Sequence, residues 1–360
     1  MQAAVLERFG HPLEILDVEV AGVGPDEVLI RTAACGVCHT DRSLQLGAQN
    51  LPLPCLLGHE ASGVVEQVGS AVRDFRPGDH VVACGSAFCG TCEWCQRGLL
   101  QHCSVKYRTR PEGQPPRLTT AGRSLDALVG LGAFAPYLLV HERAVVTIPD
   151  EMPLDRAALL GCAVLTGVGA VRHRARVTSG QTVAVIGCGG VGLNAIQGAR
   201  LCGAGAIIAI DLVPAKLERA RQFGATHTVD ASAVDSVAAV REITGEGVDH
   251  ALEVVGRPAT IEQAFAMTRT YGTVTVVGVA APGETITIPA YELMLEKRIQ
   301  GSKLGSSAFR LDIPLYCGLY RQGRLLLDEL ISKTIGLADV NQALELLDGS
   351  DQARSVIVFD

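Results

Sequence analysis

Four short apolar runs, separated by stretches of helical character, dominate the second half of the chain. They are residues 182–186, 206–210, 248–255 and 273–279, and each has the length of a single strand. Apolar runs of this kind are typical of strands buried on both faces, and their alternation with helices indicates a parallel sheet. The pattern predicts a doubly wound α/β domain in this half of the chain.

The first half alternates more finely between apolar and polar positions. The segments 28–32, 63–68 and 80–83 are typical of short strands and are separated by turns rich in Gly and Pro. We therefore expect a mostly antiparallel β domain ahead of the α/β domain. After about residue 304 the pattern loosens, and the chain ends with an expected helix at 340–347 and a strand at 355–359.

Charge and composition indicate which kinds of molecule this protein binds. The 360 residues include 31 basic and 38 acidic side chains, so the formal net charge is -7. Nucleic acids and anionic membrane surfaces require clustered Lys and Arg, which this balance does not favour. No apolar run reaches the roughly 18 to 20 residues of a membrane span. We expect a small-molecule partner, no nucleic acid and no membrane.

The chain has 12 cysteines. Oxidised secreted scaffolds with so many cysteines are normally short chains, and the N-terminus shows no charged and then apolar signal peptide. We therefore expect reduced thiols and a cytoplasmic protein. The cysteines must then serve another purpose than disulfide formation.

A glycine-rich motif follows the first apolar run of the second half. The sequence Gly187-Cys-Gly-Gly-Val-Gly192 matches G-x-G-x-x-G between a predicted strand and a predicted helix at 193–201, and Asp211 ends the next strand. In a dinucleotide site, such glycines let the backbone approach a pyrophosphate and the acidic residue holds the ribose 2′-hydroxyl. The alternative is a turn that packs helix on strand without a ligand. Asp211 would repel a 2′-phosphate, so NAD is favoured over NADP. The residues assigned to the cofactor are Gly187, Gly189, Gly190, Val191, Gly192 and Asp211.

Four cysteines lie close together at Cys89, Cys92, Cys95 and Cys103. Four thiolates on one short segment meet the demand of a closed tetrahedral zinc site. In a ferredoxin-like iron–sulfur motif the fourth cysteine follows after three residues and precedes proline, whereas here the gap is longer and Ser104 follows. The spacing predicts structural zinc, with an iron–sulfur site or a reduced cysteine-rich loop as the alternatives.

A second set of potential metal ligands is dispersed along the chain. Taken singly, its members have simpler interpretations, such as a redox C-x-x-C for Cys35 and Cys38 or a core histidine for His59. Together they supply two thiolates, an imidazole and nearby carboxylates, which is the mixed set of a catalytic zinc site with an open coordination position. The set comprises Cys38, His59 and Cys162, with Asp41 and Glu60 beside them.

The order and spacing of these motifs resemble the zinc-dependent medium-chain alcohol dehydrogenases over essentially the whole chain. The resemblance implies two zinc ions per chain, NAD, and reversible hydride transfer between a primary alcohol and NAD⁺ that gives the aldehyde. The length between Cys103 and Cys162 resembles the dimeric classes, so a homodimer is expected. The implied domains are a β-rich GroES-like catalytic domain at 1–163 with a zinc lobe at 84–104, a Rossmann domain at 164–303, and a return of the chain to the catalytic domain at 304–360.

The resemblance also assigns roles to single residues. Cys38, His59 and Cys162 would ligate the catalytic zinc, and Asp41 and Glu60 would surround these ligands. The implied cofactor contacts are His39 and Arg354 at the pyrophosphate, Lys216 at the adenosine ribose, Thr166 at the nicotinamide, and the backbone of Val277 and Val279 near the carboxamide.

The proton relay departs from the pattern of the family. Thr40 would take the proton of the alcohol and pass it to the nicotinamide ribose. Where well-known members end this relay with a histidine, this chain has Ser43. Serine does not hold a proton near neutral pH, so the relay would end in water or involve His39.

Two features bear on the substrate. Several relatives place an aromatic residue that narrows the substrate channel four residues before the first lobe cysteine, where this chain has Gly85, although Phe88 is near and could substitute. Branched or aryl alcohols should then be better substrates than ethanol. The second feature is a set of arginines in the segment 104–132, which could hold the carboxylates of a thiol adduct of formaldehyde or lie on the surface, namely Arg108, Arg110, Arg117 and Arg123.

Two alternatives therefore remain beside a simple alcohol dehydrogenase. One is a thiol-adduct-dependent formaldehyde dehydrogenase of the same family, and fold-level analogy fixes substrates only weakly. The other is a non-catalytic redox sensor that binds zinc and NAD. This second alternative would require the loss of a catalytic ligand, and the sequence shows no such loss.

Overall fold

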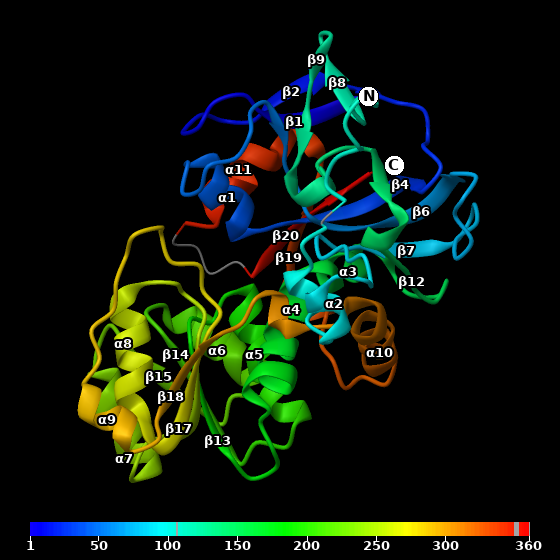
Figure 1. The fold of residues 1–360 in the computed structure, drawn as a ribbon. Helices are drawn as coiled ribbons and strands as arrows, with labels where there is room; N and C mark the ends of the chain where they lie inside the picture. The colour runs from blue at the N-terminus through cyan, green and yellow to red at the C-terminus, as the bar shows by residue number, and fades with distance from the viewer. Residues whose placement is uncertain (106, 349–352, 360) are drawn as a thin grey trace. The chain divides into compact units, whose positions relative to one another are not determined.

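The computed structural model describes residues 1–105, 107–348 and 353–359. The chain forms two compact units, one of residues 1–162 and 308–360 and the other of residues 163–307 (Figure 1). The sequence predicts boundaries after residues 163 and 303, and the structure has them after residues 162 and 307. Each unit has its own sheets and its own core.

The first unit is built on a seven-stranded sheet. Its strands are β4 (Glu27–Val37), β6 (Glu60–Val68), β7 (His80–Ala83), β11 (Tyr137–His141), β12 (Val145–Thr147), β19 (Ile331–Ile335) and β20 (Arg354–Val358). The order is β12–β7–β6–β4–β20–β19, and β11 also pairs with β4. The end of the chain therefore returns to this sheet, because β20 pairs antiparallel with β4.

Two smaller sheets and several short helices complete the first unit. One sheet contains β1 (Gln2–Leu6), β2 (Glu14–Asp17), β5 (Cys55–Leu56) and β10 (Asp126–Ala127), and the other contains β3 (Glu19–Val20), β8 (Leu118–Thr120) and β9 (Arg123–Ser124). The α-helices are α1 (His39–Gln45), α2 (Glu93–Gln96), α3 (Leu154–Ala158), α10 (Phe309–Arg321) and α11 (Val340–Leu346).

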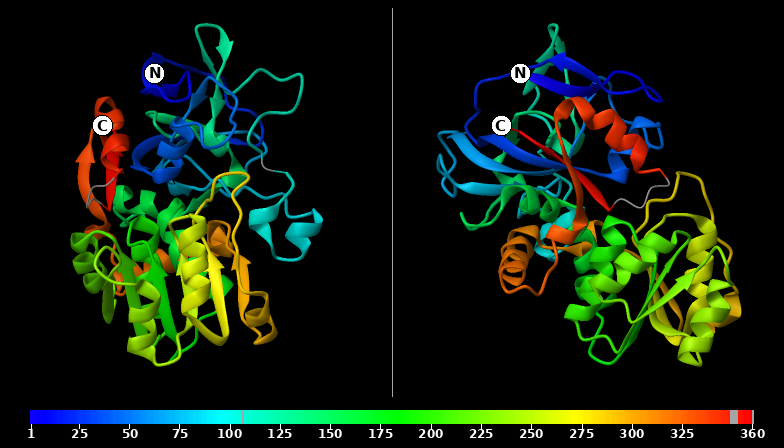
Figure 2. Two further views of the ribbon diagram at one scale, coloured as in Figure 1. Left: turned by 90° about the vertical axis from the view of Figure 1, so that its left-hand side faces the viewer. Right: turned by 180° about the vertical axis from the view of Figure 1, so that it is seen from behind.

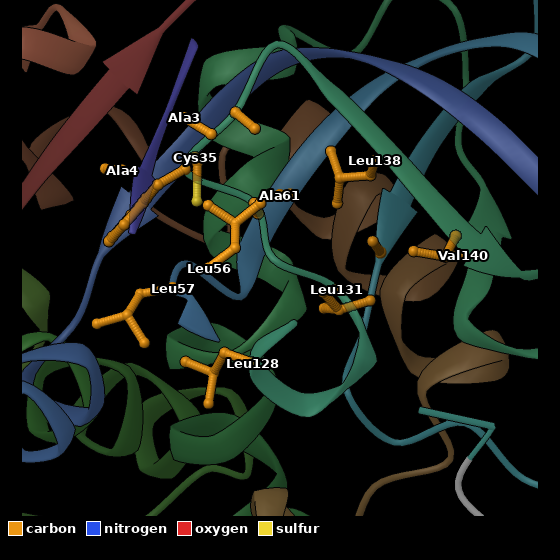
Figure 3. Close-up of a cluster of buried hydrophobic side chains, with 14 of the residues drawn as sticks. Ala3, Ala4, Cys35, Leu56, Leu57, Ala61, Leu128, Leu131, Leu138 and Val140 are labelled. Carbon is orange, nitrogen blue, oxygen red and sulfur yellow. The ribbon is translucent and has the colours of Figure 1, made fainter. Parts of the chain in front are cut away.

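Inward-facing side chains of the sheets form the core of the first unit. Along β4, Val28, Ile30 and Thr32 are buried, whereas Leu29 is only partly buried and Arg31 is exposed. This alternation is typical of an antiparallel strand with one covered face. Figure 3 shows Leu56 and Leu138 among the side chains gathered in this core. The first-half strands predicted at 28–32, 63–68 and 80–83 all lie within observed strands.

The second unit contains a six-stranded sheet that is parallel throughout. Its strands are β13 (Thr182–Ile186), β14 (Ala206–Asp211), β15 (His227–Asp230), β16 (Val248–Glu253), β17 (Thr268–Val276) and β18 (Arg298–Gly301), in the order β15–β14–β13–β16–β17–β18. The chain moves outward from β13 to β15 and then returns to the other side of β13. In such sheets ligands bind at the carboxyl ends of the strands where the order reverses, here between β13 and β16.

Helices cover both faces of the parallel sheet (Figures 1 and 2). The α-helices of this unit are α4 (Ala163–Gly169), α5 (Gly190–Leu201), α6 (Pro214–Phe223), α7 (Ser236–Thr244), α8 (Pro258–Met267) and the exposed α9 (Ala290–Met294). Helix α6 begins at Pro214, whose fixed φ suits a first turn, and ends before Gly224, which takes a left-handed φ of 115°. Helix α5 begins at Gly190, inside the glycine motif and earlier than the predicted residue 193.

Among the described residues, no single helix is long and apolar enough to cross a membrane. The segments 154–161 and 163–175 pass the criteria of length and composition only when taken together as a bent pair. The core helices of folded proteins pass the same criteria, and every residue of α4 is buried.

Candidate functional site: a zinc cluster and a dinucleotide-binding loop

Cys38 and His59 come together because the strands beside them pair. Strand β4 ends at Val37 and β6 begins at Glu60, and antiparallel pairing sets Gly36 opposite Glu60. The residues just beyond these two ends, Cys38 and His59, therefore meet at one edge of the sheet. A Cβ at position 36 would collide with the Glu60 carboxylate, so the glycine makes room for that side chain.

Cys162 reaches the same place from a third segment. Ala83 at the end of β7 pairs with Ala61 of β6, and Gly161 packs so closely on Ala83 that an added Cβ would lie 2.6 Å from its carbonyl oxygen. Cys162 follows directly and is buried. The structure thus brings the predicted ligands together, and one ligand atom from each member of the cluster lies within 4.8 Å of the others: Cys38, His59, Glu60 and Cys162.

Asp41 connects two of these residues through its carboxylate. It is the third residue of α1, and its Oδ2 accepts a hydrogen bond from the backbone N–H of Cys38 at 3.1 Å, as in a capping box. Its Oδ1 accepts hydrogen bonds from the backbone N–H of Gly58 at 3.0 Å and from Nδ1 of His59 at 3.2 Å. Because Nδ1 donates its proton to Asp41, the lone pair of His59 is on Nε2.

Glu60 and Arg354 form a buried ion pair beside the cluster. Pairing of β20 with β4 sets Ser355 opposite Val37 and so brings Arg354 next to Cys38. Nη2 of Arg354 lies 3.0 Å from Oε1 of Glu60 and 3.4 Å from Sγ of Cys38. Burial raises the pKa of Glu60 to about 7, although the charge of Arg354 acts in the opposite direction. The pKa of the Cys38 thiol is lowered by a hydrogen bond from Cys162 and by the charge of Arg354.

Two buried atoms of the cluster have no hydrogen-bond partner among the described residues, namely Nε2 of His59 and Oε2 of Glu60. Leaving a buried polar atom unpaired costs about 1–3 kcal/mol, so such atoms in a native site call for a ligand. An imidazole lone pair, two sulfur atoms and a nearby carboxylate are the donors of an open zinc site. The residues of this cluster therefore fit a zinc ion.

The four cysteines of the lobe form a second cluster. The separations of their sulfur atoms are 3.6 Å for Cys89–Cys103 and Cys92–Cys95, 3.8 Å for Cys92–Cys103 and 4.0 Å for Cys89–Cys95. Four sulfurs bound tetrahedrally at about 2.3 Å from zinc would lie roughly 3.8 Å apart. Hydrogen bonds from Thr91 and from the backbone N–H of Cys92 lower the pKa of Cys89 to about 7, which favours a thiolate. The lobe therefore fits a closed zinc site.

The glycine motif and Asp211 meet at the carboxyl end of the parallel sheet. Gly187 has a φ of 97°, which L side chains rarely adopt, and Gly192 lies against its carbonyl group. Oδ2 of Asp211 accepts a hydrogen bond from the backbone N–H of Cys188 at 2.7 Å, and Oδ1 accepts one from Val213 at 3.0 Å. Asp211 thus holds the loop directly, and its oxygens retain capacity to accept from a ribose hydroxyl.

The other cofactor residues predicted in the second unit lie in different elements. Thr166 is buried in α4, and its hydroxyl has no hydrogen-bond partner among the described residues. Lys216 lies half-buried in the first turn of α6. Val277 and Val279 follow the end of β17, and the side chain of Val279 is 69% exposed. Their roles toward NAD stay predictions.

The remaining predicted residues belong to the first unit. His39 and Thr40 are exposed in the first turn of α1, and Nε2 of His39 lies 3.1 Å from the carbonyl oxygen of Leu347. Ser43 is exposed on the same helix. Arg354 is buried against Glu60 and Cys38 as described, and its predicted contact with the pyrophosphate stays a prediction.

Comparison with known proteins decides the family. A model of the alcohol dehydrogenase GroES-like domain matches residues 24–150, and a model of zinc-binding dehydrogenases matches residues 190–316. A relative from Mycobacterium tuberculosis, named "Putative alcohol dehydrogenase D", is 39% identical over 365 residues, which cover 99% of each chain. The chain belongs to the zinc-dependent medium-chain alcohol dehydrogenase family.

This alcohol dehydrogenase combines a GroES-like domain with a Rossmann domain, as predicted. Its cofactors are zinc and NAD, and its reaction is hydride transfer between an alcohol and NAD⁺. Two further relatives carry names with different substrates. An S-(hydroxymethyl)glutathione dehydrogenase from Synechocystis is 36% identical over 366 residues, with 99% of each chain covered. The benzyl alcohol dehydrogenase of Acinetobacter calcoaceticus is 33% identical, with a TM-score of 0.94 over 100% of this chain and 99% of that chain.

The structure adds one residue near Gly85 that the sequence does not single out. A Cβ at position 85 would lie 2.6 Å from the side chain of Val129, so the isopropyl group of Val129 fills the space beside the glycine. Val129 has a φ of 49°, which is unusual for a β-branched residue. Phe88, which the sequence suggests as a substitute, packs instead edge-to-face on Phe309 at 6.0 Å between ring centroids.

A buried cluster around Glu27 has no counterpart among the patterns of the sequence. Nε and Nη2 of Arg110 donate to the Glu27 carboxylate, and Nε of Arg117 lies 2.7 Å from its Oε1. Arg117 also donates to the backbone carbonyls of Tyr107 and Arg108. Glu27 lies more than 80 residues from either arginine along the chain, so no local pattern marks the partnership.

Proposed function

We propose that this alcohol dehydrogenase oxidises primary alcohols, with aryl or branched groups preferred to ethanol, at a zinc ion held by Cys38, His59 and Cys162. The observation that carries the proposal is that Nε2 of His59, within a cluster of two thiols and a carboxylate, is buried and has no hydrogen-bond partner among the described residues. When bound, zinc acts as a Lewis acid on the substrate oxygen and lowers the pKa of the alcohol.

The residues around the ligands have distinct tasks in this proposal. Asp41 fixes the tautomer and orientation of His59 and holds the backbone of Cys38. Arg354 supplies positive charge beside Cys38 and pairs with Glu60. Thr40, two residues after Cys38, takes the proton of the alcohol through its hydroxyl. With NAD bound, the hydroxyl of Thr40 would connect the alcohol to the nicotinamide ribose, and the proton would leave to water or His39 because the side chain at position 43 is serine.

The preference for larger alcohols rests on Gly85 and Val129. Gly85 lies two residues beyond Ala83, which touches Gly161 next to Cys162, so the pair stands close to the zinc cluster. The isopropyl group of Val129 occupies the space beside Gly85, where several relatives place an aromatic side chain. An apolar wall of this kind suits an aryl or branched group. The Acinetobacter relative is named for benzyl alcohol.

The arginines of the segment 104–132 weigh against a thiol adduct as the substrate. Arg110 and Arg117 are engaged by the buried carboxylate of Glu27, and Arg123 pairs with Glu7 at 2.9 Å. Arginines whose charge is already neutralised by a protein carboxylate bind the carboxylates of a thiol adduct only weakly. Arg108 is exposed, and its side chain bonds to none of the described residues. Arg108 is therefore the one arginine of this set that suits the adduct.

Assembly and location form a further part of the proposal, namely a cytoplasmic homodimer. Strand β18 ends the order of the parallel sheet, and an open strand edge invites pairing with another chain. Tyr291 and Met294 of the neighbouring α9 are each 68% exposed, which is typical of an apolar contact surface. None of the 12 cysteines forms a disulfide, in keeping with a reducing compartment. Size-exclusion chromatography with light scattering tests the dimer.

Steady-state assays with NAD⁺ test the substrate. We expect kcat/KM to be higher for benzyl alcohol than for ethanol, and S-(hydroxymethyl)glutathione to give no advantage over benzyl alcohol. An ethanol value above the benzyl alcohol value would contradict the pocket argument. A preference for the glutathione adduct that is lost in Arg108→Ala, with benzyl alcohol turnover unchanged, would establish the formaldehyde alternative.

A further inference from the structure

Glu253 occupies the point in the Rossmann domain where the strand order reverses. It is the last residue of β16, pairs in register with Ile186 of β13 and with Val276 of β17, and is fully buried. Ile186 directly precedes the glycine motif. The side chain of Glu253 is therefore enclosed at the carboxyl ends of three strands, where open α/β sheets bind their ligands.

The carboxylate of Glu253 holds the turn that follows β16. Its Oε1 accepts hydrogen bonds from the backbone N–H of Val255 at 2.8 Å and of Gly256 at 2.7 Å, and from the hydroxyl of Thr260 at 2.8 Å. These donors lower the pKa of Glu253, but burial is the larger influence and raises it. Its Oε2 is buried and has no hydrogen-bond partner among the described residues. A buried carboxylate oxygen without a hydrogen-bond partner lowers the stability of the fold by its desolvation free energy. We therefore expect this carboxylate to have a function in addition to packing.

The main chain of Glu253 holds a second turn, the one that follows β17. Its carbonyl oxygen accepts hydrogen bonds from the backbone N–H of Val277 at 2.7 Å and of Gly278 at 3.0 Å. One residue thus fixes the backbone of both turns beside the glycine motif. Val277 is among the residues assigned to the nicotinamide carboxamide.

The two turns pack on each other and on the glycine motif. A Cβ at Gly187 would lie 2.8 Å from Cγ2 of Val255, and a Cβ at Gly256 would lie 2.6 Å from the backbone nitrogen of Val279. Spacings this close leave little freedom, so a shift of the 255–256 turn must displace its neighbours. The side chains of Val255 and Val279 remain partly exposed at 43% and 69%, and they offer apolar surface for the rings of a dinucleotide.

We propose that Glu253 is a positioning residue for NAD, which holds the turns after β16 and β17 in the arrangement that the cofactor requires. The inference rests on the proposed function to the extent that the second unit binds NAD at Gly187–Gly192. Glu253 acts through the two turns and does not itself contact the reacting atoms.

A series of substitutions in the zinc-loaded enzyme tests this role, with NADH affinity measured by fluorescence titration. Glu253→Gln retains a carbonyl oxygen as acceptor and should keep the wild-type dissociation constant. Glu253→Met has similar length but no comparable acceptor, and loss of the bonds to two backbone N–H groups should raise the dissociation constant at least about tenfold. Glu253→Asp is too short to reach both N–H groups and should lie between these values. The KM for NAD⁺ should rise in the same order, while kcat at saturating NAD⁺ stays near the wild-type value.

Thr260→Val is the matched control, because it removes one donor to Oε1 and leaves both turn N–H bonds in place. It should bind NADH like the wild type. Glu253→Met with a lower melting temperature but unchanged NADH affinity would show a merely structural role and overturn the inference. If the Met variant does not fold, wild-type affinity in Glu253→Asp would overturn it equally. Wild-type enzyme that bound no NADH would overturn the proposed cofactor site itself, and this inference with it.

Discussion

Asp41 orients His59, because its Oδ1 lies 3.2 Å from Nδ1 of the imidazole while its Oδ2 holds the backbone N–H of Cys38. A single buried carboxylate therefore sets the position of two proposed zinc ligands, which lie just beyond the ends of two different strands. Such partners of metal ligands are worth about 10–100-fold in metal affinity or activity.

Asp41→Asn should weaken the catalytic zinc and leave the lobe zinc in place. An amide has one acceptor oxygen and cannot receive both the His59 and Cys38 protons in the same geometry. We expect zinc affinity of the catalytic site to fall about 10–100-fold, measured by competition with a chromogenic chelator. The lobe, bound by four cysteines elsewhere, is the internal control. Retention of both ions with wild-type affinity would show that Asp41 does not orient the ligand.

Cys89→Ala should destabilise the lobe. Structural zinc contributes directly to folding free energy, and the variant lacks one of four sulfur ligands. Trp94, the single tryptophan of the chain, lies between Cys92 and Cys95 and packs on His102 at 5.8 Å between ring centroids, so its emission reports on the lobe. We expect a lower midpoint of thermal unfolding and an altered Trp94 emission spectrum. Cys202→Ala, at a half-buried cysteine with no assigned role, should change neither quantity.

Glu27→Gln should lower stability in a manner that depends on pH. Burial acts to raise the pKa of Glu27, but hydrogen bonds from Arg110 and Arg117 outweigh it and lower the pKa to about 2. The contribution is therefore fully present above the ordinary pKa of 4.5 and is lost as the pH falls toward 2. Removing one partner of a buried ion pair costs about 3–5 kcal/mol, and we expect a loss of that order at pH 7.

Urea unfolding of wild type and Glu27→Gln, compared between pH 7 and pH 3, measures this effect. The difference in unfolding free energy should stay constant down to about pH 4.5 and shrink below it. Arg110 and Arg117 remain charged over this range, so they do not contribute to the change. A difference that grew as the pH fell would contradict the assigned ion pair.

Local patterns were sufficient for much of this molecule. Four of the six parallel strands, the glycine motif and the cysteine lobe are each encoded within a few consecutive residues, so spacing and periodicity predict them. The edge strands β15 and β18 contain polar and charged residues and no apolar run, so the sequence pattern does not predict them. Contacts between distant residues leave no such trace. Glu60 and Arg354 are separated by 294 positions and Glu27 and Arg117 by 90, and only strand pairing and loop packing bring them together. The same holds for Val129, which contacts the space beside Gly85 only because its backbone takes a left-handed φ, and no residue pattern in the sequence predicts that conformation.

Asp211→Gly should shift the cofactor preference toward NADP. The carboxylate of Asp211 contacts the glycine motif through the bond from the N–H of Cys188, and it also accepts a bond from the N–H of Val213 ahead of α6. Its negative charge repels a 2′-phosphate. Loss of charge-assisted hydrogen bonds should also lower kcat/KM for NAD⁺ at least about tenfold. The measured quantity is the ratio of kcat/KM for NADP⁺ to that for NAD⁺. An unchanged ratio would remove Asp211 from the ribose site.

The zinc content and alcohol turnover of Cys162→Ala show whether the cluster of Cys38, His59 and Cys162 is the catalytic zinc site. The structure places Cys162 in the cluster with Cys38 and His59, which shares no residue with the four-cysteine cluster of the lobe. The account predicts two zinc ions in the wild type, one in the variant, a folded protein by circular dichroism, and no oxidation of benzyl alcohol with NAD⁺. A Cys162→Ala enzyme that oxidised the alcohol at the wild-type rate would contradict the assignment of this cluster as the catalytic zinc site.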